Sequence, residues 1–317
     1  MSGTRRAVAI GGGTGLPLVL RCLVDLGFST TAVVTVADDG GSSGSLRREL
    51  GILPPGDIRN CLVALAEPAH PLAEVFQYRF AAGEGLAGHA LGNLIIAALA
   101  ELKGGFAEGI DAAAALLGSR GRVLPSTLSD VVLSAEDECG DRITGQANVA
   151  RSTATVHRVH MDPHEPPAYP PVLEAIAAAD LVVIGPGSLY TSVIPNLLVA
   201  GIAQALAMTE ARVVYVCNVA NQRGETTGMD AADHVAALLV HGLEGIIDTA
   251  IVHHAAAAGG RGSAAALVAA DASARNRISA WGIDVVSAPL ARVTAPMQHD
   301  FDALRAVLGE VAGVVHR

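Results

Sequence analysis

The chain has 317 residues, 51% of them hydrophobic, and a formal net charge of −10. This length and hydrophobic content allow one large α/β domain or two smaller ones. The negative charge disfavours binding of DNA or RNA, because no Lys/Arg cluster longer than Arg47-Arg48 offsets it.

The sequence shows no clear signal peptide, membrane span or cysteine motif. The first six residues lead straight into an apolar run and leave no room for a signal peptide. No apolar stretch reaches the roughly 20 residues of a membrane span, so we expect a cytoplasmic protein without one. The four cysteines form no C-x-x-C pair, which disfavours a disulfide framework or a zinc site. Lys103 is the only lysine, which excludes a Walker-A lysine and leaves a phosphate clamp to arginines and backbone N–H groups.

The first predicted element is a strand that ends in a glycine-rich turn. Val8–Ile10 is apolar, and after the turn Leu16–Leu26 is typical of a helix. Glycines allow a ligand to approach the backbone, and a helix N-terminus offers N–H groups to an anion. The spacing is G-x-G-x-G rather than G-x-G-x-x-G, so it predicts phosphate binding and only weakly a dinucleotide site. The candidate phosphate-binding residues of this turn are Gly11, Gly12, Gly13, Thr14 and Gly15.

A second predicted strand, Thr31–Val36, leads into a polar loop, Ala37–Gly44. An acidic residue at this place can hold a ribose, two adjacent aspartates can help to bind a hard cation, and Gly and Ser form N–H-rich concavities that favour anions. A capped surface loop is the alternative. The candidate binding residues here are Asp38, Asp39, Gly40, Gly41, Ser42 and Ser43. Asp38 and Asp39 are also the candidate metal ligands.

Polar residues near the starts of two later helices extend the candidate site. Asp57 is placed to cap a helix that runs through Ala66, and it is also our candidate catalytic residue if a reaction occurs. Asn60 lies in the first turn of the same helix. His89 and Asn93 are spaced i, i+4, so both could face one cleft, although a structural role is equally open. Helices are predicted at Pro71–Phe80, Ala90–Lys103 and Ile110–Leu117.

The pattern changes between Val123 and Met161. The short runs Val131–Ser134, Ile143–Gln146 and Thr155–His160 are β-like and separated by polar turns. They predict a small antiparallel excursion from a mainly parallel sheet. We therefore expect a single α/β domain over residues 1–317 with a small β-rich insertion at about 123–161. A helix at Val172–Ala179 follows it.

The opening pattern then recurs. The buried-type strand Asp180–Ile184 ends in a Gly/Ser loop, and an apolar helix follows through Met208. The next strand, Arg212–Cys217, again ends in polar residues. Because ligands of doubly wound sheets bind beyond the carboxyl ends of strands, two such units favour one phosphate-binding cleft. The candidate binding residues here are Gly185, Gly187, Ser188, Tyr190, Thr191 and Asn218.

The C-terminal third gives weaker signals. Short strands are predicted at Thr249–His253, Ala266–Ala269 and Ile283–Ser287, and a last helix at Phe301–Leu308, which His299-Asp300 is expected to cap. The segment Ala255–Ala266 is so rich in Ala and Gly that its pattern indicates neither helix nor strand.

Together, the segments Ala9–Gly15, Thr35–Gly44, Pro54–Asn60, Gly88–Asn93 and Gly185–Ser192 make the chain similar to the YvcK family. Its members are also called gluconeogenesis factors. The family is related to CofD, the 2-phospho-L-lactate transferase of deazaflavin cofactor synthesis. The resemblance spans nearly the whole chain and is much closer to YvcK than to CofD.

The resemblance implies a CofD-like, Rossmann-type three-layer α/β fold. It also implies binding of UDP-N-acetylglucosamine and a role in carbon metabolism, cell shape or envelope synthesis. It carries no firm catalytic activity. In the CofD branch, an aspartate in the region of Asp57 contacts the deazaflavin. The chain departs from the family in the C-terminal third: no tyrosine occurs around Ala255–Gly262, and Gln298 stands where an arginine is common.

Three functions follow as hypotheses. The first, which we favour, is a regulator that binds UDP-N-acetylglucosamine without turnover. The second is a CofD-like transferase that moves a phospho-acyl group from a nucleotide to a deazaflavin-type acceptor. It would use a divalent cation such as Mg²⁺ near Asp38 or Asp39, with Asp57 orienting the acceptor. The third, an NAD-linked oxidoreductase, is disfavoured by the glycine spacing. Protein partners and self-association stay open.

Overall fold

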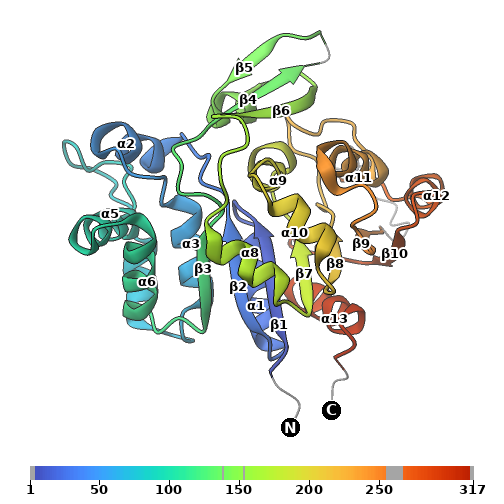
Figure 1. The fold of residues 1–317 in the computed structure, drawn as a ribbon, viewed down its shortest axis with the longest axis horizontal. Coiled ribbons are helices and arrows are strands. Elements are labelled where there is room, and N and C mark those ends of the chain that lie inside the picture. The colour runs from blue at the N-terminus through green and yellow to red at the C-terminus, as the bar shows by residue number, and fades with distance from the viewer. Residues whose placement is uncertain (1–3, 138, 153, 255–266, 315–317) are drawn as a thin grey trace.

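A computed structural model describes residues 4–137, 139–152, 154–254 and 267–314. Its centre is a seven-stranded sheet in the order β10-β9-β8-β7-β1-β2-β3, in which every described pairing is parallel (Figure 1). The strands of this sheet are β1 (Arg6–Gly11), β2 (Ser29–Val34), β3 (Gly121–Pro125), β7 (Leu181–Ile184), β8 (Arg212–Val216), β9 (Thr249–His253) and β10 (Asp284–Ala288).

Helices cover both faces of this sheet, which gives three layers. Strand β1 shows why: Val8 and Ile10 pack into one apolar core, and Ala7 and Ala9 pack into the other, since side chains alternate along a strand. One core is covered by α1 (Leu16–Asp25), α3 (Gly56–Leu65), α4 (Pro71–Gln77), α5 (Leu91–Lys103), α6 (Phe106–Leu116) and α13 (Phe301–Val311). The other is covered by α8 (Pro170–Ala177), α9 (Ile194–Leu197), α10 (Ile202–Met208), α11 (Ala231–Leu238) and α12 (Ala272–Ala280).

The topology places a ligand site. The chain winds from β1 outward through β2 to β3, and then returns to lay β7 against the other side of β1 before it continues to β10. The winding therefore reverses between β1 and β7. In open α/β sheets, ligands bind at such a point, beyond the carboxyl ends of the strands.

The predicted antiparallel excursion is present. The strands β4 (Val132–Asp137), β5 (Arg142–Thr144) and β6 (Val156–Asp162) form a sheet in the order β5-β4-β6, with α7 (Gln146–Arg151) beside them. This small sheet stands above the carboxyl edge of the main sheet (Figure 1). Residues 123–125 belong to β3 of the main sheet, so the excursion begins later than we expected. The fold class predicted from the sequence, a mainly parallel α/β fold with an antiparallel excursion, is confirmed.

Several local predictions need correction. Residues from Gly41 onward do not continue the polar loop but begin α2 (Gly41–Leu50). The predicted single helix after β7 is interrupted. A single π-helical turn, η1 (Leu189–Val193), leads into α9, and a non-helical segment that ends at Gly201, whose φ is +89°, separates α9 from α10. The strand predicted at Ala266–Ala269 is wrong: its described residues, 267–269, form no strand, and Leu267 makes only an isolated bridge to Ala220.

Other parts were missed in the sequence or lie outside the described residues. The pattern did not predict α12, the second π-helical turn η2 (Leu239–Leu243), or the hairpin of β11 (Ala291–Arg292) and β12 (Ala295–His299). Residues 255–266 lie outside the described residues, so our reading of that segment has no structural counterpart. Within the described ranges, no helix has both the length and the apolar character needed to cross a membrane.

Candidate functional site

The two glycine-rich turns meet at the carboxyl edge. A Cβ atom on Gly15 would overlap the carbonyl oxygen of Pro186 and lie 2.8 Å from its carbonyl carbon, and a Cβ atom on Gly187 would lie 3.0 Å from the carbonyl oxygen of Gly12. The turns therefore pack backbone against backbone, which only residues without a side chain allow. Gly11–Gly15 and Gly185–Ser188, far apart in the sequence, form one continuous wall.

The loop after β8 holds the second turn in place. The N–H of Gly187 donates to Oδ1 of Asn218 at 3.1 Å, and Nδ2 of Asn218 donates back to the carbonyl oxygen of Gly187 at 2.8 Å. Nε2 of Gln222 donates to the hydroxyl of Ser188 at 2.9 Å. The amide of Asn218 thus satisfies both backbone groups of one glycine, and this fixes the turn without any charge.

A cavity of about 620 Å³ opens beside these turns. Its walls are the start of α1, both glycine-rich turns, the loop after β8, the hairpin β11–β12 and the start of α13. It is large enough for a nucleotide-sized ligand. The lining residues that offer N–H groups, hydroxyls, an amide or a positive charge include Thr14, Gly15, Arg21, Gly187, Ser188, Asn218 and Arg292.

Asp57 holds the first turn rather than its own helix. The residue before α3 is Pro55, and no side chain caps this helix, so the predicted capping role is wrong. Instead, the carboxylate of Asp57 accepts a hydrogen bond from the N–H of Gly13 at 2.6 Å. Burial raises the pKa of Asp57 to about 6; the Gly13 N–H opposes this rise, and the negative charge of Asp38 adds to it. Asp57 is therefore a carboxyl group poised to gain or lose a proton near neutral pH.

Asp38 and Asp39 are adjacent in the sequence but bond to different parts of the molecule. Oδ1 of Asp38 accepts from the N–H of Gly40 at 2.9 Å, and burial raises the pKa of Asp38. Oδ1 of Asp39 accepts from the N–H of Ala147 at 2.8 Å, in the first turn of α7. Asp39 therefore ties the small sheet to the main body. Asp38 is the one whose charge acts on the pKa of Asp57.

Ser43 extends the Asp38 side of the site, since its hydroxyl accepts from the N–H of Gly56 at 3.2 Å. Among the described residues, no group of three or more His, Cys, Asp or Glu side chains has the arrangement of a metal site. A cation shared by Asp38 and Asp39 gains no support from the different contacts of these two side chains. The assignment of Asp38 and Asp39 as metal ligands therefore stays a prediction.

His89 and Asn93, whose spacing predicted that both could face one cleft, converge on one hydroxyl group. The Oγ of Ser42 lies 3.1 Å from Nδ1 of His89 and accepts from Nδ2 of Asn93 at 3.0 Å. All three side chains are buried. Asn60 has a different neighbour, because its Oδ1 accepts from Nη2 of Arg59 at 2.7 Å. The contacts of Ser42 explain how the starts of α2 and α5 stay together; contact of these residues with a ligand remains a prediction.

Tyr190 and Thr191 lie inside the protein. The hydroxyl of Thr191 donates to Oε1 of Glu225 at 2.7 Å, and the N–H of Tyr190 donates to Oε2 at 3.2 Å. Glu225 is buried, and burial raises its pKa. Sequence reasoning missed this contact, for which the polar character of the loop after β8 is the only signal. The Gly185–Ser188 turn is therefore followed by residues that a buried carboxyl group supports.

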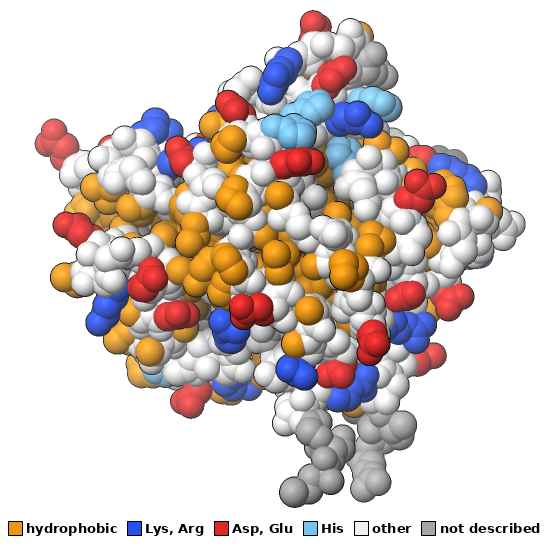
Figure 2. Space-filling view, viewed as in Figure 1, with side chains coloured by type: hydrophobic (Ala, Val, Ile, Leu, Met, Phe, Trp, Pro, Cys, Tyr) orange, Lys and Arg blue, Asp and Glu red, His pale blue; other side chains and the backbone are white. Residues whose placement is uncertain are grey.

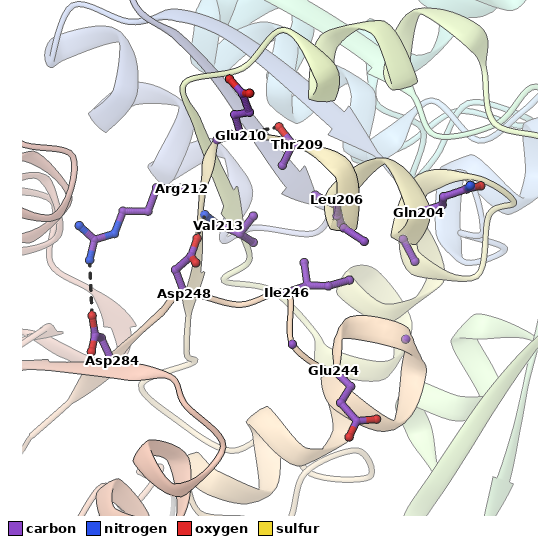
Figure 3. Close-up of a pocket in the computed structure, with 15 residues that line it drawn as sticks. Gln204, Leu206, Thr209, Glu210, Arg212, Val213, Glu244, Ile246, Asp248 and Asp284 are labelled. Carbon is purple, nitrogen blue, oxygen red and sulfur yellow. Dashed lines mark hydrogen bonds and ion pairs between the residues drawn. The ribbon is translucent and has the colours of Figure 1, made fainter.

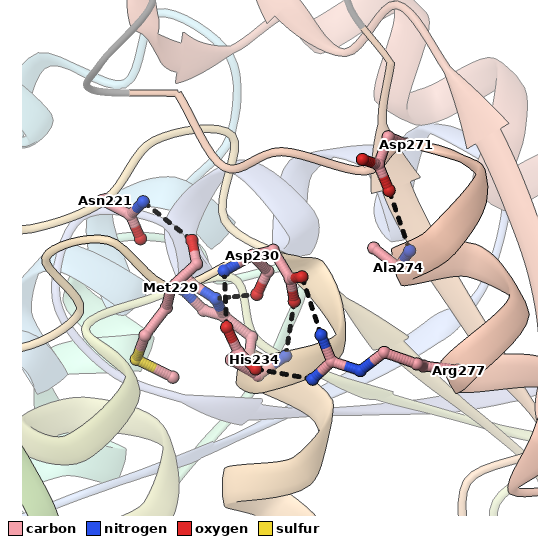
Figure 4. Close-up of polar contacts among 8 residues, drawn as sticks. Asn221, Met229, Asp230, His234, Asp271, Ala274 and Arg277 are labelled. Atoms are coloured by element: carbon pink, nitrogen blue, oxygen red, sulfur yellow. Dashed lines mark hydrogen bonds and ion pairs between the residues drawn. The ribbon is translucent and has the colours of Figure 1, made fainter.

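A second polar network braces the same loop from outside (Figure 4). Nδ2 of Asn221 donates to the carbonyl oxygen of Met229 at 2.9 Å. Asp230 and Asp233 form a capping box at the start of α11. Arg277 of α12 bonds to Asp230 at 2.8 Å and to Asp233 at 2.6 Å. The loop that carries Asn218 is thus held at both ends by contacts within the protein.

Two other hollows lie apart from the predicted residues. One, of about 900 Å³, lies at the opposite edge of the sheet, where β8 and β10 begin, and contains Arg212, Asp248 and Asp284 (Figure 3). Another, of about 450 Å³, lies where β6 meets η2 and includes His160 and His241. Figure 2 shows histidines gathered below the small sheet. Neither hollow contains a residue that the sequence analysis assigned to the site.

Comparison with known proteins agrees with the fold and the motifs. The family model of the 2-phospho-L-lactate transferase CofD matches residues 7–291. A gluconeogenesis factor from Halalkalibacterium halodurans is 49% identical over 249 residues, which are 78% of this chain and 77% of that protein. One from Bacillus subtilis is 46% identical over 252 residues, covering 79% and 80% of the two chains. A relative from Nostoc sp. is 50% identical over 249 residues, but the match spans 55% of that protein.

A solved structure gives the same result for the fold. A crystal structure of a UPF0052 family member from Bacillus halodurans superposes with a TM-score of 0.89 at 40% sequence identity. The superposition covers 97% of this chain and 99% of the other. Nearly the whole fold is therefore shared.

Proposed function

Because the chain belongs to the CofD family, we propose that it is a regulatory protein that binds the nucleotide sugar UDP-N-acetylglucosamine without turning it over. We further propose that it acts in the cytoplasm, in carbon metabolism, cell shape and envelope synthesis. Relatives at 42–50% identity carry the name gluconeogenesis factor, which supports the link to carbon metabolism. The observation that carries the ligand class is the packed pair of glycine-rich turns beside a cavity of nucleotide size.

The chemistry of the cavity fits a phosphorylated sugar. The N-terminus of α1 and the backbone of Ser188 in the second turn offer N–H groups to a diphosphate. The amides of Asn218 and Gln298 and the carboxylate of Asp302 are suited to hydroxyl and amide groups. No lysine lies in this wall, so arginine and backbone groups supply its positive potential.

A CofD-like transferase is the second candidate function, and the pair Asp38 and Asp57 favours it. Burial raises the pKa of both carboxyl groups, and the charge of Asp38 raises that of Asp57 further. Carboxyl groups with raised pKa values are typical of acid–base sites. In this function Asp57 would hold a proton near the acceptor, and Asp38 would help to hold a divalent cation such as Mg²⁺.

A panel of ligands in thermal-shift and calorimetric assays separates these functions, because a ligand that binds only the folded state raises the unfolding midpoint. The panel contains UDP-N-acetylglucosamine, UDP, GTP with Mg²⁺, a deazaflavin, and NAD. Stabilisation by UDP-N-acetylglucosamine, with the ligand recovered intact, is the expected result. Stabilisation by GTP and a deazaflavin only with Mg²⁺ would establish the transferase instead, and a response to NAD alone would exclude both.

A further inference from the structure

We infer that the hairpin β11–β12 carries the phosphate-binding cation of the nucleotide-sugar cavity, and that this cation is Arg292. The inference rests on the proposed function and assigns a specificity-determining residue within it. Arg292 lines the cavity from the wall formed by the hairpin, which also contributes Gln298. The first glycine-rich turn and α1 belong to the same cavity, so a diphosphate bound at their N–H groups would meet this wall.

The hairpin is anchored firmly at its base. Nε2 of His299 donates to the carbonyl oxygen of Cys217 at the end of β8, at 3.0 Å. The N–H of Leu290 donates to Nδ1 of His253 at 3.0 Å, and the N–H of Asp300 donates to the carbonyl oxygen of Leu290 at 2.7 Å. The ends of two strands of the main sheet therefore fix the place where the hairpin starts. Beyond that base, Arg292 pairs across the hairpin with Ala295 and is exposed.

The two histidines keep this anchor intact at ordinary pH. Burial lowers the pKa of His299 to about 4, and burial also lowers the pKa of His253, with His254 adding to the effect. Both rings are therefore neutral near pH 7, and the Nδ1 atom of His253 keeps the lone pair that accepts from Leu290. The anchor therefore fixes the base of the hairpin, whose residue Arg292 lines the cavity.

Arg292 differs from Arg21, the other arginine of the cavity, in the partners of its charged group. The guanidinium of Arg21 lies 5.7 Å from the ring centroid of Phe301, so it already has a cation–π partner. Among the described residues, no carboxylate forms an ion pair with Arg292. Gln298, on the neighbouring strand, has no charge. Arg292 is therefore the cation best placed to make charge-assisted hydrogen bonds to a phosphate.

The test is calorimetric titration of the full chain with UDP-N-acetylglucosamine and with UDP. The variant Arg292→Ala is expected to lower the affinity for both ligands about 10- to 100-fold, which is the range for loss of a hydrogen bond to a charged group. Arg292→Lys should recover part of this loss because it keeps the charge. The matched control is Arg122→Ala, an exposed arginine in β3, which should leave both affinities unchanged.

Salt dependence adds a readout that a merely structural role would not move. Binding to the unchanged protein should weaken more steeply with rising salt than binding to Arg292→Ala, since salt screens an exposed charge. If the unchanged protein binds UDP-N-acetylglucosamine and Arg292→Ala binds it equally well, the role of Arg292 is wrong while the proposed function stands. If the unchanged protein does not bind UDP-N-acetylglucosamine, the proposed function is wrong, and this inference is wrong with it.

Discussion

The two glycine-rich turns form one wall, but different side chains hold them. The first turn is held by a carboxylate: the N–H of Gly13 donates to Asp57, whose pKa burial raises to about 6. The second is held by an amide: Asn218 bonds to both backbone groups of Gly187. An amide does not titrate, so only the first turn is expected to respond to pH.

This difference also indicates where a phosphate can bind. The N–H of Gly13 is already occupied by a carboxylate, and an anion placed there would be repelled by the charge of Asp57. The N–H groups of Thr14 and Gly15 lie further along the turn, and the second turn is held by an uncharged amide. We therefore expect the diphosphate to lie over Thr14, Gly15 and Ser188.

The largest expected effect comes from adding a side chain where the turns touch. Gly15→Ala places a Cβ atom against the Pro186 carbonyl group, so one backbone must move. We expect the free energy of unfolding to fall by about 3 kcal/mol or more, because overpacking against backbone is hard to relieve. We also expect ligand binding to be lost. Denaturant unfolding and calorimetry measure the two effects.

Gly11→Ala is the matched control from the same motif. A Cβ atom there would lie 3.8 Å from Cδ1 of Leu16, an ordinary contact distance, and should cost much less stability. Equal losses in Gly11→Ala and Gly15→Ala would show that the motif is sensitive throughout, and that the contact with Pro186 has no special part.

The sequence predicted the fold well where the chain is regular. Apolar runs such as Leu181–Ile184 form strands that are buried on both faces, and their hydrophobic pattern is strong. The prediction from sequence failed where tertiary contacts determine the secondary structure. The segment Gly41–Leu50 has a polar, glycine-containing start that is typical of a loop, yet it is helical, with the Oγ of Ser42 bonded to side chains from another segment.

The candidate site shows the same limit. Apolar runs that end in glycine-rich turns predicted that both turns lie at one edge of the sheet, because parallel strands end together. They did not predict which partners hold them. The bond between Asp57 and Gly13 joins residues 44 positions apart, and Asp39 bonds to Ala147 across 108 positions. Such pairs depend on packing that no local pattern records.

The next effect concerns pH. The folded pKa of Asp57 is raised from 3.8 to about 6, so the folded protein binds more protons than the unfolded chain between these values. Stability from this residue is therefore present below about pH 4 and is lost as the pH rises to about 6. The loss is at most about 3 kcal/mol, at 1.36 kcal/mol for each pKa unit. Denaturant unfolding across this range measures it.

Asp57→Asn provides the reference for this measurement. Its amide oxygen can still accept from the N–H of Gly13, but it does not titrate. The unfolding free energy of the unchanged protein, relative to that of Asp57→Asn, should therefore decrease from pH 4 to pH 6. A flat difference would mean that the carboxyl group of Asp57 has an ordinary pKa and that the two turns respond to pH alike.

A smaller effect follows from changing the neutral support of the second turn. Asn218→Ala removes two hydrogen bonds to Gly187, and we expect a loss of about 2 kcal/mol. Asn218→Asp keeps the acceptor for the Gly187 N–H but places a carboxylate against the Gly187 carbonyl oxygen. Its stability should therefore fall as the pH rises through the pKa of the new carboxyl group. If the stability of Asn218→Asp did not change with pH, a negative charge at position 218 would have no effect on the second turn.

The smallest expected effect tests whether Asp39 binds the ligand or only anchors the small sheet. Its carboxylate accepts from the N–H of Ala147 in the first turn of α7, so Asp39→Ala should cost about 1 kcal/mol, as the loss of a helix cap does. Hydrogen exchange should quicken in Arg142–Arg151, while the affinity for UDP-N-acetylglucosamine should change little. Asp38→Ala serves as the comparison, because the charge of Asp38 acts on Asp57. A large loss of affinity in Asp39→Ala with unchanged exchange would support the predicted binding role of Asp39, since loss of a residue that only anchors the small sheet should also change exchange there.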